Sequence, residues 1–493
     1  GRVAKGRAAL AMAAVAVAAA FVMLLAAISV VHPHDSSLLS FLGINLGSFP
    51  QMQPGQEAPR LPQGDDVKWI SLGYYGSSDL VGKGLDLKKL QSQGKSILLH
   101  FWDYTSVDSL ELVPVMERIN WRFAPYGLVV IGVHRSRYRF AKNSLFVKNA
   151  FERLRLNYAV VNDIDGDITN AFGAHDINTM FLINNDNSIV AVKSGYHVGS
   201  QMEMNICQYF SRTNQGIMCN PQWPWGNYYA QWKQSTVNGK QNLWLAAGGG
   251  YDGKRCHQAS KDVFVGNYVS DNLGHTSIYP GSLSRYQHVN AESRGGAFKD
   301  LSGVPLDDGA FALSGEWAML DQGREVMGSK GGGLVDTHLR VRYHGDMAYG
   351  LLGLKKIEQW KVDMCTDGTS GNEKAGLQCK TQCRDVAGRY GPYGYCHTSK
   401  DSWGGCKPCE PVRPSKVYLL LDGSPVPKES RGADVVEDAL GRTYVPVLDS
   451  RIYSLISEKA IWPRGLTLLP SEEGVVFHQF TFRGNCSPRI YRS

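Results

Sequence analysis

The 493-residue chain lacks a clustered run of basic residues beyond its first few positions. Its formal charge of +7 is spread along the sequence, and the tight basic group is Arg2, Lys5 and Arg7. A face that binds nucleic acid requires Lys and Arg gathered on one helix or stripe, usually with stacking aromatic residues. The charge distribution therefore excludes a nucleic-acid-binding class of protein.

The sequence also lacks an internal repeat, which excludes solenoid and propeller architectures. Hydrophobic residues make up 43% and charged residues 20%, so the composition is that of a globular protein and not of a disordered or fibrous one. The 54 glycines indicate many turns and short strands. The length predicts two or three domains.

One long apolar stretch stands near the start of the chain. From Ala8 to Val31, Ser29 is the only polar residue. At about 1.5 Å per residue this stretch is long enough to cross a hydrocarbon core of roughly 30 Å. The basic residues before it predict a cytoplasmic or stromal N-terminus, with the rest of the chain exported. A cleavable signal or transit peptide is the alternative interpretation.

The ten cysteines fit an exported protein, because disulfides persist in oxidising compartments. Six of them crowd into residues 365–409, a segment with too little apolar content for a core of its own. We expect disulfides there, with connectivity left open. The disulfide candidates are Cys207, Cys219, Cys256, Cys365, Cys379, Cys383, Cys396, Cys406, Cys409 and Cys486.

Zinc is the rival interpretation of the same segment. Cys379 and Cys383 form one close pair, Cys406 and Cys409 form another, and His397 lies between them in the sequence. Such paired spacing is typical of zinc ligands, but an oxidising compartment favours disulfides. We therefore expect no metal and no cofactor.

The chain divides by texture into four parts. Short apolar runs alternate with helical stretches up to about residue 215, which predicts a mixed sheet flanked by helices. Beyond it, strand-like runs separated by Gly, Pro and Asp predict a β-sandwich. The expected boundaries are an anchor with its flanks at 1–42, a linker at 43–66, an α/β domain at 67–215, and a β-sandwich at 216–493 with a cysteine-rich insertion at 365–409.

Residues 95–114, KSILLHFWDYTSVDSLELVP, resemble the active-site strand and helix of thioredoxin-like proteins of the TlpA and DipZ type. Phe101, Trp102, Tyr104 and Pro114 match that pattern. The resemblance implies a thioredoxin-like α/β domain. In the DipZ type this domain precedes a jelly-roll-like β-sandwich similar to carbohydrate-binding modules, so the resemblance implies one here too.

The residues that carry the family's chemistry differ in this chain. Ser106 and Ser109 stand where the resemblance places the two cysteines, and Asn178 stands where it places a cis-proline. Dithiol chemistry needs one thiolate to attack and a second thiol to resolve the mixed disulfide. We therefore expect a redox-inactive domain that is not an enzyme. His134 and His175 could serve Ser106 as a base, but no nucleophile elbow or triad motif surrounds it.

Three carboxylates at Asp163, Asp165 and Asp167 suggest either a calcium loop or a turn. The bidentate Glu that an EF-hand needs is absent at the required spacing. A hairpin turn is therefore the better interpretation.

Aromatic residues in the second half suggest two kinds of binding surface. Trp317 and Tyr279 would bind sugar if exposed, although core positions are the simpler expectation. Aromatic residues in the cysteine-rich segment could form a protein contact surface, or simply a solvated rigid loop. These residues are Tyr390, Tyr393, Tyr395 and Trp403.

These observations predict a non-catalytic, membrane-anchored accessory or scaffold subunit of a membrane protein complex, with photosynthetic and respiratory complexes as plausible hosts. Its expected partners are integral membrane subunits and the lipid bilayer. The body would lie in the thylakoid lumen, the periplasm or the extracellular space. The alternatives are a surface-anchored glycan- or polymer-binding module, and an atypical thiol-disulfide or chaperone-like protein.

Overall fold

The structure is a computed structural model that divides into two compact units, and every described residue belongs to the unit formed by 49–272 and 276–493. The described residues are 51–61, 68–73, 84–85, 87–174, 176, 178–195, 198–212, 217, 219, 236–237, 240–241, 259–266, 268–270, 276–278, 296–298, 306–327, 337–358, 364–372, 374–381, 383, 395–409, 412–459 and 462–484.

Several expectations fall outside these residues. The apolar stretch Ala8–Val31 is one of them, and among the described residues no helix has the length and apolarity needed to cross a membrane. The other positions outside the description are His175, Cys256, Tyr279, Tyr390, Tyr393 and Cys486.

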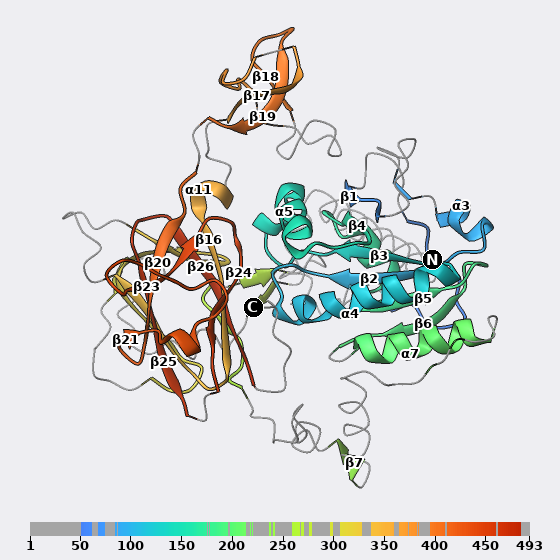
Figure 1. The fold of residues 1–493 in the computed structure, drawn as a ribbon, viewed down its shortest axis with the longest axis horizontal. Helices are drawn as coiled ribbons and strands as arrows, with labels where there is room; N and C mark the ends of the chain where they lie inside the picture. The colour runs from blue at the N-terminus through green and yellow to red at the C-terminus, as the bar shows by residue number, and fades with distance from the viewer. Residues whose placement is uncertain are drawn as a thin grey trace, which may run out of the picture. The chain divides into compact units, whose positions relative to one another are not determined.

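The first part of the described chain is an α/β domain built on a six-stranded sheet of order β1-β4-β3-β2-β5-β6 (Figure 1). The central strands β2, β3 and β4 are parallel, and the remaining neighbours pair antiparallel. The strands are β1 (Lys68–Ser71), β2 (Ser96–Trp102), β3 (Leu128–His134), β4 (Ala159–Asn162), β5 (Met180–Ile183) and β6 (Ile189–Lys193). The helices are α3 (Leu87–Ser92), α4 (Val107–Phe123), α5 (Ser144–Leu154), α6 (Asp167–Phe172) and α7 (Val198–Ser211), with 3-10 turns η3 (Ala124–Tyr126) and η4 (Phe140–Lys142).

Helices cover both faces of this sheet, which is why β2 and β3 are buried along their whole length. Leu98 and Trp102 point into one core with residues of α4, α5 and α7. Leu99 and Phe101 point into the other core with residues of α3 and α6. The continuous apolar run of β2 thus fills two cores by strand alternation.

Part of the expected linker at 43–66 is packed against the domain. The backbone N–H of Gly55 donates to Ile189 O at 2.8 Å, and that of Ala58 donates to Asn187 O at 2.8 Å. Ala58 and Leu61 are buried in the core on the α3 side. The linker interpretation is therefore wrong for residues 51–61, because two isolated apolar residues leave no periodic signal in the sequence.

The second part is an extensive antiparallel β region, whose main path runs β22-β23-β20-β25-β15-β13-β14-β26-β16-β24, with β9, β12 and β21 as side branches. Its strands are β9 (Val263–Phe264), β12 (Gly296–Phe298), β13 (Phe311–Leu320), β14 (Gly323–Val326), β15 (His338–Tyr343), β16 (Met347–Leu354), β20 (Ser415–Leu421), β21 (Ser424–Pro425), β22 (Val436–Glu437), β23 (Thr443–Val447), β24 (Arg451–Ser457), β25 (Arg464–Pro470) and β26 (Val475–Arg483). Smaller elements are β7 (Thr236–Val237), β8 (Lys240–Gln241), β10 (Tyr268–Ser270), β11 (Thr276–Ile278), α11 (Lys355–Glu358) and η5 (Lys428–Ser430).

Strand β13 joins two halves of this region. Its first residues, Phe311–Ser314, pair with β15, and its last, Trp317–Leu320, pair with β14. Gly315 lies at the change with φ of +92°, and a Cβ there would lie 2.7 Å from the Thr337 Cα. One hydrophobic core contains side chains from both halves, including Leu419 of β20 and Phe477 of β26.

Strand β16 is buried on both faces because each face belongs to a different core. Tyr349 and Leu351 lie in the core that contains α4 and α7 of the α/β domain. Ala348 and Leu352 lie in the core of the β region. The alternation continues through Leu354, although the pairing with β26 shifts register between Leu351 and Leu352. Strand β16 therefore contributes side chains to the core of the α/β domain and to the core of the β region.

The cysteine-rich insertion is a separate three-stranded sheet of order β17-β19-β18. We call residues 364–409 the cysteine module; its strands are β17 (Met364–Gly371), β18 (Tyr395–His397) and β19 (Trp403–Pro408). Three disulfides join Cys365 to Cys409, Cys379 to Cys396 and Cys383 to Cys406. A fourth joins Cys207 of α7 to Cys219.

Candidate functional site

The candidate site lies where β2 ends and α4 begins, at residues 103–109. Ser106 is the N-cap of α4 and makes no capping hydrogen bond with its side chain. Ser109 lies in the first turn of the helix and is 0% exposed, while Ser106 is 5% exposed. Both hydroxyls are thus withdrawn from solvent at the helix N-terminus that the resemblance assigns to dithiol chemistry.

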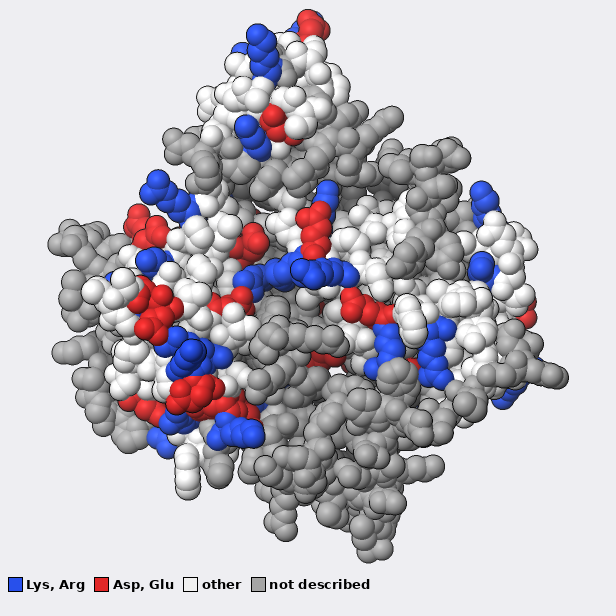
Figure 2. Space-filling model, viewed as in Figure 1, with Lys and Arg blue, Asp and Glu red and all other residues white. Residues whose placement is uncertain are grey.

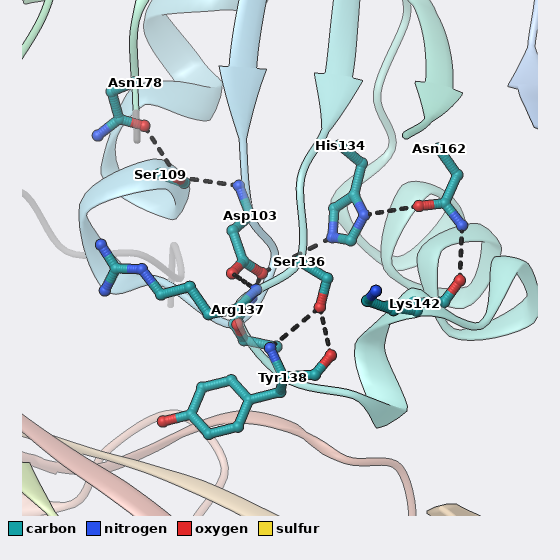
Figure 3. A network of polar contacts seen from close by, with 10 residues as sticks. Asp103, Ser109, His134, Ser136, Arg137, Tyr138, Lys142, Asn162 and Asn178 are labelled. Atoms are coloured by element: carbon teal, nitrogen blue, oxygen red, sulfur yellow. Dashed lines mark hydrogen bonds and ion pairs between the residues drawn. The ribbon is translucent and has the colours of Figure 1, made fainter. Parts of the chain in front are cut away.

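Ser109 is fixed by two hydrogen bonds inside the protein (Figure 3). Its Oγ accepts from the backbone N–H of Asp103 at 3.1 Å and donates to Asn178 Oδ1 at 2.8 Å. Asn178 has a left-handed backbone with φ of 67°, and its own N–H donates to Phe101 O at 2.8 Å. Ser109 and Asn178 therefore form one buried polar connection between α4 and the loop before β5.

Asp103 anchors the loop between β2 and α4. Its Oδ1 accepts from the Thr105 N–H at 2.8 Å and from the Thr105 hydroxyl at 2.6 Å, and its Oδ2 accepts from Arg137 N–H at 3.1 Å. Burial alone would raise the pKa of Asp103, but His134 and these Thr105 bonds outweigh it and hold the pKa below its usual value. Asp103 is therefore a buried carboxylate that organises the loop.

The His134 ring lies among Asn162, Asp103 and Tyr104. Its Nδ1 lies 3.0 Å from Asn162 Oδ1, and its Nε2 lies 3.7 Å from Asp103 Oδ1. The ring stacks on Tyr104 with centroids 5.2 Å apart. Figure 3 shows His134 between Asp103 and Asn162, on the strands beside the serine turn. Nucleophilic catalysis requires a base within hydrogen-bond reach of the hydroxyl, and His134 is engaged elsewhere.

The Asp163 carboxylate binds the first turn of α6, so residues 163–167 connect strand β4 to a helix and the hairpin-turn prediction is wrong. Its Oδ1 accepts from Ile168 N–H at 3.1 Å, and its Oδ2 accepts from the Thr169 N–H at 2.8 Å and hydroxyl at 2.6 Å. Both oxygens are therefore used to satisfy the free N–H groups of a helix start.

The N-terminal turn of α4 is occupied by the β region through Arg483, the last residue of β26. The guanidinium forms an ion pair with Asp108 and a second with Glu111, where Nε lies 3.2 Å from Oε1. Asp262 lies 3.7 Å from the same guanidinium. Asp108 stands between the two serines in sequence, so the β region lies against the turn that bears them.

A second group of contacts lies beside the ion pairs. The Tyr138 hydroxyl donates to Gln479 Oε1 at 3.0 Å, and the Arg139 N–H donates to Gln322 Oε1 at 2.8 Å. The rings of Tyr138 and Phe140 contact the His478 ring at centroid distances of 5.4 and 4.8 Å. The contact between the two parts thus combines apolar burial with satisfied polar groups.

Burial shifts two carboxyl groups around Arg483. It raises the pKa of Glu111 to about 8, against the attraction of Arg483 and with the repulsion of Asp108. It raises the pKa of Asp262 to about 6 in the same way. Three carboxyl groups share one guanidinium, so protonating one of them relieves an excess of buried negative charge.

Other predicted binding residues lie apart from this turn. Trp317 is 1% exposed and packs against Phe477, so it cannot serve as a sugar platform. Tyr395 and Trp403 are half-buried and contact each other in the cysteine module, with centroids 5.8 Å apart. On the face seen in Figure 2, Lys and Arg lie among Asp and Glu.

No protein-family model matches this chain. The thiol-disulfide oxidoreductase ResA of Halalkalibacterium halodurans is 27% identical over 117 residues, which cover 24% of this chain and 62% of ResA. The protein SUPPRESSOR OF QUENCHING 1, chloroplastic, of Arabidopsis thaliana is 24% identical over 103 residues, which cover 21% of this chain and 10% of that protein. The matched stretches thus span less than two thirds of these relatives.

Among solved structures, that of StoA from Bacillus subtilis shares 20% identity, with a TM-score of 0.21 and coverage of 23% of this chain and 82% of StoA. The likeness to ResA and the strand order support a thioredoxin-like fold of the thiol-disulfide oxidoreductase type for the α/β domain.

Replacing Ser109 tests the buried connection. Ser109→Ala leaves the Asp103 N–H and Asn178 Oδ1 without their partner, so the free energy of unfolding is expected to fall by about 1–3 kcal/mol. Ser106→Ala is the matched control, because Ser106 makes no capping bond, and its loss should stay below about 1 kcal/mol. Urea unfolding followed by circular dichroism measures both. Equal losses would contradict the arrangement.

The pKa of Glu111 predicts a pH dependence of stability. The folded protein holds this proton up to about pH 8, whereas the unfolded chain releases it near the ordinary value of 4.5, so stability falls as pH rises between them. Between about pH 6 and about pH 8.5 the loss should be on the order of 2–3 kcal/mol. Glu111→Gln should remove most of it, and the exposed Glu152→Gln should not. An unchanged slope in Glu111→Gln would refute the assignment.

Proposed function

We propose that this protein is a non-catalytic, membrane-anchored accessory or scaffold subunit of a membrane protein complex. The observation that carries the proposal is the covering of the α4 N-terminus by Arg483 of the chain's own β region. In a thiol-disulfide oxidoreductase that turn must admit a partner's disulfide. Here the same turn serves as an internal contact.

The chemistry of the turn supports the same conclusion. We equate Ser106 and Ser109 with the two redox cysteines of the resembled family and Asn178 with its cis-proline. A serine hydroxyl is not ionised at neutral pH and cannot form a mixed disulfide. The Ser109 hydroxyl also takes part in two internal hydrogen bonds. The domain retains the fold of its oxidoreductase relatives while its reactive positions have a structural role.

The remaining features suit a subunit held at a membrane. We propose that Ala8–Val31 anchors the chain, that the β region is a jelly-roll-like sandwich, and that both folded parts lie on the lumenal or periplasmic side. The disulfides joining the described cysteines suit such an oxidising space. The host complex would be photosynthetic or respiratory, and the plant relative's chloroplastic name favours the photosynthetic choice.

The two alternatives have less support. The glycan-binding alternative needed an exposed aromatic platform, and Trp317 is buried beside Phe477. The thiol alternative needs a reactive cysteine, and the described cysteines are all paired. The relative ResA is named a thiol-disulfide oxidoreductase, so the thiol alternative is the one that experiment must exclude.

The covering of the turn can be measured with a single introduced thiol. Ser106→Cys should react with a maleimide at least about tenfold more slowly than Ser92→Cys, which places its thiol at the exposed end of α3. Adding Arg483→Ala should speed the first reaction and not the second, because it removes the ion pairs at the turn. The unsubstituted chain gives the background. Equal rates for both cysteine variants would show an open turn.

The scaffold role predicts stable companions. Extracted from its native membrane in mild detergent, the chain should migrate in a particle much larger than its 54.3 kDa, with integral membrane subunits identified by mass spectrometry. The Arg483→Ala variant tests whether the ion pairs at the α4 turn are needed for assembly.

A lone monomer in the detergent extract would contradict the scaffold role. Reduction of insulin disulfides by the purified chain, retained in Ser106→Ala, would support the thiol alternative instead.

A further inference from the structure

The cysteine module brings four sulfur atoms into one cluster. The Sγ atoms of Cys379, Cys383, Cys396 and Cys406 all lie within 4.8 Å of one another. They belong to two disulfides, Cys379–Cys396 and Cys383–Cys406. The unbonded sulfurs of Cys379 and Cys406 are nevertheless only 3.9 Å apart. The two bridges therefore lie in direct contact with each other.

This spacing matches what a tetrahedral metal ion requires. Zinc binds thiolate sulfur at about 2.3 Å, so four sulfurs around one ion lie about 3.8 Å from each other. The unbonded pair already has that separation. The bonded pairs would have to move apart by less than about 2 Å when their bridges are opened. The cluster is thus a compact set of four soft ligands.

The backbone holds three of the four cysteines by means other than the sulfur bonds. Cys396 of β18 pairs with Gly404 of β19. Cys406 of β19 pairs with Thr366 of β17. The Cys379 N–H donates to Met364 O at 2.7 Å. The third disulfide, Cys365–Cys409, closes the base of the module separately. The backbone can therefore keep Cys379, Cys396 and Cys406 together when the two central bridges are open.

Burial and charge also suit a metal centre. Cys396 and Cys406 are buried, and Cys379 and Cys383 are half-buried, so the cluster is sheltered on one side and reachable on the other. Four thiolates and one zinc ion carry a net charge of −2, and Lys380 and Lys407 flank two of the ligands in sequence. A closed set of four cysteines is typical of a structural zinc site.

We propose that Cys379, Cys383, Cys396 and Cys406 form a zinc site when their two disulfides are reduced. A dithiol reductant gives each bridge two electrons and two protons and is itself oxidised to a disulfide. The four resulting thiols release their protons as Zn²⁺ binds, and the zinc stays divalent. The module then has two closed states, one cross-linked by disulfides and one by the metal.

The two states would belong to different redox conditions. The disulfide state suits an oxidising exported compartment, and the zinc state suits a reducing one, such as that met before export. This ligand set differs from the paired spacing in the sequence, because it excludes Cys409, which is bonded to Cys365 outside the cluster. The inference does not depend on the accessory-subunit proposal.

The test uses the full chain purified with and without a dithiol reductant. The reduced chain should retain about one zinc per molecule after dialysis, measured by mass spectrometry of the metal, and the oxidised chain none. Cys396→Ser should lose the zinc, and Cys409→Ser, the matched control outside the cluster, should keep it. A reduced chain that retains no zinc while its four thiols react freely would overturn the proposal, and so would equal loss in both variants.

A second measurement does not depend on how the variants fold. Cobalt titrated into the reduced, unsubstituted chain should give the intense visible absorption of tetrahedral cobalt bound to thiolates, and zinc should displace it. Only weak absorption, typical of octahedral cobalt with oxygen ligands, would overturn the four-cysteine site.

Discussion

The arrangement of the described protein depends on one strand that is buried on both sides. Tyr349 and Leu351 of β16 complete the core of the α/β domain, while Ala348 and Leu352 complete that of the β region. Neither part can bury these side chains without the other, so separating them would expose apolar surface on both. The two parts are therefore joined in the manner of a single core, and the α4 turn is covered because it lies at their junction.

Electrostatics acts on top of this apolar contact. Arg483 faces Asp108, Glu111 and Asp262 in a partly desolvated space, where an unbalanced charge is costly. Burial is the main cause of the raised pKa of Glu111, and the repulsion of Asp108 adds to it. The apolar side chains of β16 hold the two parts together, whereas the charged groups around Arg483 make their contact sensitive to pH. An acidic compartment would strengthen it.

Much of the fold could be predicted from the sequence, because its signals are local. The apolar run of β2 and the FWDY pattern at its end indicate an α/β domain. Ser106 and Ser109 can be identified from the sequence whichever residue begins the helix. The ion pair between Arg483 and Asp108 joins residues 375 positions apart, and a single sequence contains no signal for such a pair. Asp103 likewise looks like an ordinary loop residue until its three hydrogen bonds are seen. The packed segment 51–61 was missed because its stabilising contacts are backbone bonds to a distant strand.

Asn178 holds its loop in a backbone conformation that proline cannot adopt. Proline has its φ fixed near −65° and has no N–H, whereas Asn178 has φ of 67° and donates its N–H to Phe101. Changing both serines to cysteine would supply two thiols without altering this loop. A proline at position 178 could adopt neither the φ of Asn178 nor its N–H bond to Phe101. The backbone around Asn178 therefore sets a requirement of its own, separate from the side chains at positions 106 and 109.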